Sequence, residues 1–151
     1  MSRVRLWPDP VLQRPAEPVA AFDDALSELV ADLLSEMYAA NARGMAAPVL
    51  GVSKRVFVMD CDWKSGARAP RAFVNPTLVA RSDTHLAAVE HCISLPGEPR
   101  SVLRPDAVEV AWFDCEAMPQ RSWFSGASAR MIQHDYDHLD GRLIIDYAAA
   151  V

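Results

Sequence analysis

The sequence has few cysteines and no long hydrophobic run. Its 151 residues include only three cysteines, and so few, in odd number, argue against the disulfide framework of a small secreted domain. No apolar stretch approaches the ~18 residues that a membrane-spanning helix needs. The first ten residues hold two arginines and two prolines and do not resemble a signal peptide. These absences predict a cytoplasmic protein without a membrane partner.

Runs of basic residues are also missing. The net charge is −5, so the chain has no general attraction for the phosphates of a nucleic acid, and no nucleic-acid partner is expected. A composition that is 51% hydrophobic and 23% charged excludes a disordered tail, a coiled coil and a collagen-like fibre. The length fits one domain, spanning residues 1–151, that can bury roughly 70% of its unfolded surface.

Two segments have the apolar spacing of helices. Between residues 22 and 38 the apolar side chains recur every three or four positions, and Asp23 and Asp24 suit the positive end of the helix dipole. A second helix is predicted over residues 126–139, ended by Gly141.

The segments between the helices have the composition of strands and loops. The proline-rich residues 7–18 are expected to run extended over the surface, and residues 95–99 to form a tight loop. Strands are predicted at residues 55–60, 72–79, 86–94 and 107–114. This order, a helix, several strands and a helix, indicates an α+β fold with a largely antiparallel or mixed sheet.

Two histidines stand four residues apart in the second predicted helix. His134 and His138 lie on one helical face, from which both can bind one metal ion. Asp135, next to the first histidine, can serve as general base for water on that metal. The same spacing also arises by chance, so from the spacing alone a metal site and two unrelated histidines are both open.

A catalytic metal site needs a third protein ligand and an open position. Cys92, which precedes a proline-glycine loop, is the candidate, although a free cysteine is more commonly a small buried apolar residue. Cys61 and Cys115, at strand ends, are expected to fill space in the core or at the surface. His85 and His91 are expected to be solvated.

Three segments, in this order, resemble the signature motifs of the peptide deformylase family. GMAAPVLG (residues 44–51) resembles G-x-G-L-A-A-P-Q-x-G, EHCISLP (residues 90–96) resembles E-G-C-L-S-x-P, and QHDYDHLDG (residues 133–141) resembles Q-H-E-x-D-H-L-x-G. The resemblance extends from about Leu6 to Asp146. It implies antiparallel or mixed sheets around a central helix that carries both histidines.

The resemblance assigns a reaction and a cofactor. It implies that Cys92, His134 and His138 bind one divalent metal ion, which is iron(II) in the family and can be replaced by zinc, nickel or cobalt. The family removes the formyl group from N-formyl-methionyl peptides, so the expected partner is the N-terminus of a nascent chain. The oxyanion of the reaction is held by the backbone N–H that corresponds to Ile93 and by a glutamine of the first motif.

Two departures from the family motifs fall on the chemistry. Asp135 replaces a glutamate, and the shorter side chain retracts the carboxylate by roughly 1 Å, a displacement that can cost ~10²-fold in rate. Val49 replaces the oxyanion glutamine, and losing one such donor costs ~10²–10³-fold. The sequence therefore predicts reduced activity, with a non-catalytic metal- or peptide-binding paralogue as the alternative.

The resemblance also predicts residues around the metal. The substrate cleft is assigned to Arg43, Gly44, Met45, His91, Arg130 and Met131. Arg43 and His91 depart from the family. They are expected either to narrow the cleft or change its charge, or to reflect sequence drift at an exposed rim.

Support of the ligands is assigned to Glu90, Gln133 and Asp137, although Asp137 could equally be solvated. Arg100 is predicted to pair with Glu90, to meet a substrate carboxylate or to lie at the surface.

Many family members continue into a C-terminal helix that docks on the ribosome. Because this chain ends soon after Asp146, such docking is not expected.

Overall fold

The computed structural model describes residues 3–149. Two α-helices are present in this range, α1 (Asp24–Ala39) and α2 (Gly126–Leu139). Three single-turn 3-10 helices are η1 (Pro10–Gln13), η2 (Ala47–Leu50) and η3 (Ile144–Asp146). The strands of this range are β1 (Gly44–Ala46), β2 (Val56–Met59), β3 (Arg71–Arg81), β4 (His85–Glu90), β5 (Arg100–Pro105), β6 (Ala107–Phe113) and β7 (Pro119–Ser125).

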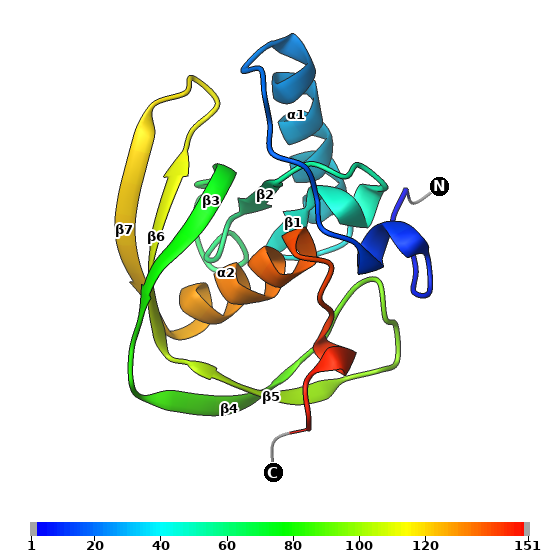
Figure 1. Cartoon of the computed structure of the whole chain (residues 1–151), viewed down its shortest axis with the longest axis vertical. Helices are drawn as coiled ribbons and strands as arrows, with labels where there is room; N and C mark the ends of the chain where they lie inside the picture. The colour runs from blue at the N-terminus through cyan, green and yellow to red at the C-terminus, as the bar shows by residue number, and fades with distance from the viewer. Residues whose placement is uncertain (1–2, 150–151) are drawn as a thin grey trace.

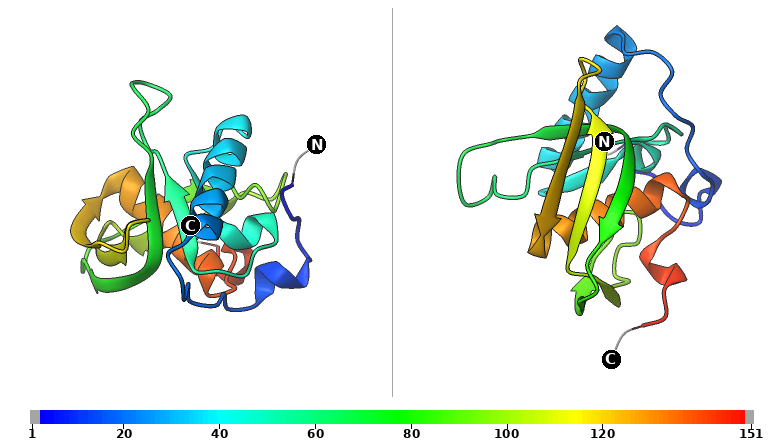
Figure 2. Two further views of the ribbon diagram at one scale, coloured as in Figure 1. Left: turned by 90° about the horizontal axis from the view of Figure 1, so that it is seen from above. Right: turned by 60° about the vertical axis from the view of Figure 1, so that its left-hand side comes forward.

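The strands form two antiparallel sheets around α2. One sheet has five strands in the order β1-β2-β3-β6-β7, and the other pairs β4 with β5. Figure 1 shows α2 crossing the middle of the molecule, with the strands β3, β6 and β7 on one side and the β4–β5 ribbon below it. Turning the molecule brings those three strands in front of α2 (Figure 2). The predicted α+β class and the central position of the second helix are confirmed.

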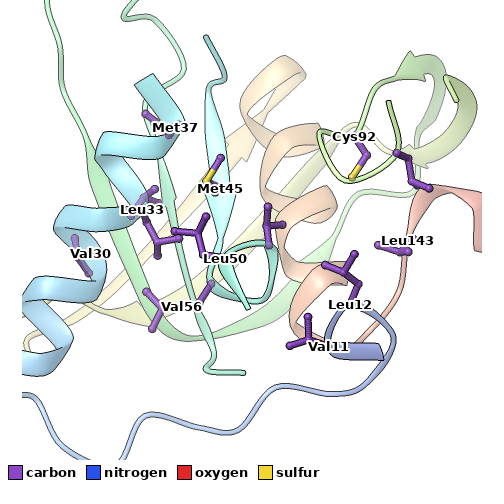
Figure 3. Close-up of a cluster of buried hydrophobic side chains, with 14 of the residues drawn as sticks. Val11, Leu12, Val30, Leu33, Met37, Met45, Leu50, Val56, Cys92 and Leu143 are labelled. Atoms are coloured by element: carbon purple, nitrogen blue, oxygen red, sulfur yellow. The ribbon is translucent and has the colours of Figure 1, made fainter. Parts of the chain in front are cut away.

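Helix α1 begins and packs as its sequence dictates. The Asp23 side chain caps it by accepting a hydrogen bond from the backbone N–H of Leu26 at 3.1 Å. Its buried side chains recur at spacings of four, three and four: Leu26, Val30, Leu33 and Met37. This apolar stripe packs against β2 and forms one hydrophobic core with the residues labelled in Figure 3.

The prediction that residues 7–18 run extended is wrong at residues 10–13. Residues 10–13 form the turn η1, in which Val11 and Leu12 are buried in the core (Figure 3). Asp9 caps this turn by accepting from the backbone N–H of Val11 at 3.0 Å, and proline at the first helical position already has a helical φ. The prolines therefore form a turn that anchors the segment instead of extending it.

Parts of the sheets were not predicted. The segment expected as a strand over residues 86–94 is β4 only as far as Glu90, after which the chain turns. Strand β7 lies at the edge of its sheet and is mostly exposed, so its sequence has no buried alternation. Strand β5 buries Arg104 on the same face as Val102. Because a charged residue occupies a buried position, the sequence of β5 lacks the alternation of apolar and polar residues that predicts a strand.

The glycine that ends α2 is required by a close approach of the chain. Gly141 has a φ of 74°, and a Cβ there would lie 2.7–2.8 Å from backbone atoms of Gln13 and Arg14. We expect Gly141→Ala to lower the free energy of unfolding by roughly 3 kcal/mol or more, because the backbone strain adds to a backbone clash. Urea unfolding followed by circular dichroism measures this change.

Gly126 provides the matched control. Its φ is 61°, also left-handed, but nothing lies within 4 Å of the position of a Cβ. Gly126→Ala should therefore cost only the strain, about 1–2 kcal/mol. If the free energy of unfolding fell equally in the two variants, the close approach of residues 13–14 would not be the reason that position 141 requires glycine.

Candidate metal centre

The fold brings together the cysteine and the two histidines. His134 and His138 are one turn apart on α2, and Cys92 lies in the turn after β4. Ligand atoms of the three side chains all lie within 4.8 Å of one another, and Cys92 Sγ is 3.5 Å from His138 Nε2. With metal–sulfur and metal–nitrogen bonds of about 2.3 and 2.0–2.1 Å, a tetrahedral ion would separate these two atoms by about 3.6 Å. The donor set therefore fits one small divalent ion.

The donors are enclosed by protein. Cys92 is 5% exposed and His138 is 2% exposed. Burial lowers the pKa of His138 to about 3, and the positive charge of Arg104 acts in the same direction. The imidazole is therefore neutral, which is the form that binds metals. Its Nδ1 has no hydrogen-bond partner among residues 3–149.

Glu90 holds the first histidine in place. Its Oε1 lies 3.0 Å from His134 Nδ1, which leaves Nε2 as the ring nitrogen free for a metal. Arg104 contacts both carboxylate oxygens, with Nε at 2.6 Å and Nη2 at 2.9 Å, and Arg130 Nη1 donates to Oε2 at 2.6 Å. Burial would raise the pKa of Glu90, but the bonds from His134 and Arg104 lower it to about 2. Glu90 is thus a carboxylate that orients the histidine.

Arg104 has a role here that the sequence did not predict, although it resembles a basic residue that the family has after the cysteine loop. Its side chain is 3% exposed, and Nη1 also donates to Asp137 Oδ2 at 2.9 Å. Asp137 is consequently paired and not simply solvated. Of the alternatives for Arg100, the pairing with Glu90 is wrong, because Arg100 Nη1 donates to the carbonyl of Tyr147 at 2.8 Å.

A cavity of about 1010 Å³ opens beside the three donors. Of the residues expected to bind substrate it is lined by Arg43, Gly44, His91, Arg130 and Met131, together with Ile93 and Asp135.

Two predicted residues lie elsewhere in the structure. Met45 and Val49 belong to the hydrophobic core, where they are 1% and 2% exposed, and neither belongs to the cavity lining found within residues 3–149. Met45 is labelled in Figure 3 among the core side chains. The assignment of Met45 to the cleft is corrected: strand alternation turns it away from the side on which Gly44 lies.

Asp135 points into a tightly packed corner of the cavity. A Cβ on Gly44 would collide with Asp135 Oδ2 and would lie 2.8 Å from Met131 Sδ. Oδ2 has no hydrogen-bond partner among the described residues, and burial raises the pKa of Asp135 to about 7. A carboxyl group that titrates near neutrality is suited to accept and return a proton.

Three further side chains differ from expectation. Arg130 lines the cavity, but its guanidinium donates to Glu90 and to the carbonyls of Leu86 and Val102, so its charge is not free for a substrate. Gln133 donates to the carbonyls of Pro105 and Ala129 and fixes α2 to the end of β5. Within residues 3–149 it has no hydrogen bond to a predicted ligand. Cys61, expected to be filler, also lines the cavity, and burial raises the pKa of its thiol.

Fold and site together define a class of protein. Three protein donors beside an open cavity are typical of catalytic metal centres, whereas structural centres are closed by a fourth ligand. This α+β domain has such a centre on its central helix and a buried acid next to the first histidine. The arrangement is typical of a metal-dependent hydrolase.

Comparison with known proteins identifies the family. The family model described as polypeptide deformylase matches residues 1–151. A peptide deformylase of Maricaulis maris is 42% identical over 140 residues, which cover 93% of this chain and 80% of that protein. One of Synechocystis sp. is 37% identical over 138 residues, 91% of this chain and 74% of that protein. The crystal structure of peptide deformylase from Thermotoga maritima has a TM-score of 0.92 at 33% identity, with 99% of both chains covered. The chain belongs to the polypeptide deformylase family.

Proposed function

We propose that this protein is a cytoplasmic metal-dependent deformylase that removes the formyl group from N-formyl-methionyl peptides. One divalent metal ion is held by Cys92, His134 and His138; iron(II) is the first choice, with zinc, nickel or cobalt as substitutes. The observation that carries the proposal is the grouping of the three ligand atoms within 4.8 Å, at a cavity that also contains Asp135. Three free cysteines agree with a reducing compartment.

The chain supplies the remaining chemistry around the ion. A metal ion bound there would supply a Lewis acid that activates water. Asp135, next to the first histidine, would accept a proton from water and return it to the leaving amine. The backbone N–H of Ile93, which lines the cavity and has no acceptor among residues 3–149, donates to the developing oxyanion.

Two features predict a slow enzyme. Val49 has no donor group and is buried in the core, so the oxyanion lacks a second donor from the protein, at a cost of ~10²–10³-fold. The short side chain of Asp135 costs up to ~10²-fold more if its carboxylate is misplaced by about 1 Å.

Formate release from a formyl-Met-Ala-Ser peptide tests the proposal. We expect protein loaded anaerobically with iron(II) or cobalt(II) to release formate faster than Cys92→Ala treated in the same way, because that variant lacks the thiolate donor. The released formate is measured with a coupled formate dehydrogenase. Equal rates in the two proteins would contradict a deformylase function for this substrate.

A non-catalytic peptide- or metal-binding protein is the second candidate. The burial of Val49 in the core favours it, since the site then lacks a donor that the resemblance assigns to catalysis. This candidate predicts stoichiometric metal binding without formate release, and no gain from Asp135→Glu.

A further inference from the structure

The side chain of Tyr147, in the segment after η3, contacts residues that support the metal centre. The hydroxyl of Tyr147 donates to Asp137 Oδ2 at 2.6 Å and accepts from Arg104 Nη1 at 3.2 Å. The backbone carbonyl of Tyr147 accepts from Arg100 Nη1 at 2.8 Å. Tyr147 is therefore fixed at its backbone and at the tip of its side chain, in contact with α2 and with β5.

Two guanidinium groups hold the ring of Tyr147. The Cζ atom of Arg142 lies 3.7 Å from the ring centroid, and that of Arg104 lies 4.9 Å from it. Both distances are within the range of cation–π contacts. The ring cannot turn without losing these contacts, so the hydroxyl is held in one position against Asp137.

The same hydroxyl lies at the end of a hydrogen-bonded chain that leads to a metal ligand. Arg104 divides its donors: Nη1 goes to Asp137 and Tyr147, while Nε and Nη2 go to Glu90. The guanidinium is planar and rigid, so the position of Nη1 sets the direction of the other donors. Glu90 Oε1 in turn lies 3.0 Å from His134 Nδ1.

We propose that Tyr147 is a positioning residue for the metal centre, which acts on His134 through Asp137, Arg104 and Glu90. The proposal rests on the proposed function, because it requires His134 to be a metal ligand. Without the hydroxyl, Asp137 loses a donor and the outer end of Arg104 loses one of its two anchors. The carboxylate that orients His134 is then held less firmly, and the metal dissociates faster.

Tyr147→Phe removes the hydroxyl and keeps the ring between the two arginines. We expect cobalt(II) to dissociate from Tyr147→Phe roughly 3- to 10-fold faster than from the wild type, less than the ~10–100-fold loss that follows removal of a group in direct contact with a ligand. The visible absorption of the cobalt–thiolate centre reports dissociation after a chelator is added in excess. Its band positions report changes of coordination geometry that do not depend on activity.

Tyr136→Phe, on the helix α2 that carries both histidines, is the matched control. Its ring contacts Arg55, and its hydroxyl has no hydrogen bond among residues 3–149, so the cobalt dissociation rate should stay within about twofold of the wild type. A Tyr147→Phe variant with an unchanged rate and spectrum would overturn the inference, even if its unfolding temperature falls. A wild-type protein that takes up no cobalt would overturn both the inference and the proposed function.

Discussion

Replacing Cys92 with alanine is expected to remove the bound metal almost completely. The substitution deletes the one thiolate among the three donors, whose Sγ lies 3.5 Å from His138 Nε2. Two histidines alone leave the ion with mostly water ligands, so affinity should fall by more than the ~10²-fold that loss of an indirect support can cause. Metal analysis of anaerobically purified protein should fall from about one ion per chain to near zero.

A second cysteine in the same cavity makes this test specific. Cys61 also lines the cavity, but it is not among the three clustered donors. Cys61→Ala should therefore keep about one metal ion per chain and the cobalt–thiolate absorption. Metal retained by Cys92→Ala, or lost by Cys61→Ala, would contradict the assignment of the thiolate ligand.

Local sequence patterns predicted the helices because helix formation depends on near neighbours. The predicted second helix, residues 126–139, has the same bounds as α2, since a glycine at each end and the apolar spacing between them define it. Strand β7 was missed because an exposed edge strand needs no apolar alternation of its own. Its place depends on pairing with β6, for example Val108 with Phe124, which its own sequence does not encode.

The site was predictable where motifs fix it and unpredictable where tertiary contacts do. Cys92, His134 and His138 stand in recognisable spacings, and the structure brings them together. The pairing of Glu90 with Arg104 and the return of Tyr147 to Asp137 join residues 10 to 14 positions apart. The first contact is made between the paired strands β4 and β5 and the second where the final segment meets α2. No single stretch of sequence specifies either contact.

Restoring both missing groups should produce the largest gain in rate. Asp135 Oδ2 lies near Gly44 and Met131 and has no hydrogen-bond partner among the described residues. In Asp135→Glu, one more methylene extends the carboxylate beyond this position. This change alone should raise formate release by roughly 10- to 10²-fold. Adding Val49→Gln supplies an amide donor, which is worth ~10²–10³-fold only where it reaches the oxyanion from this core position. Together the changes should approach ~10⁴-fold if they act independently.

Matched variants separate the chemistry from side-chain volume. Val49→Met has nearly the same bulk as Val49→Gln but no donor, so in the Asp135→Glu background it should give no further gain. Asp135→Asn keeps the size and removes the base, and should lower the wild-type rate by up to ~10²-fold, the part of the ~10²–10⁴-fold value of a general base that a displaced carboxylate still supplies. Both are measured as initial rates of formate release at equal metal content.

Val49 lies in the core, so a glutamine there is stabilised only if its amide reaches the cavity. Otherwise a buried polar group without a partner costs about 1–3 kcal/mol of stability. A destabilised double variant with no gain in rate would show that position 49 does not open onto the site, and that the chain around η2 has adapted to the loss of the glutamine.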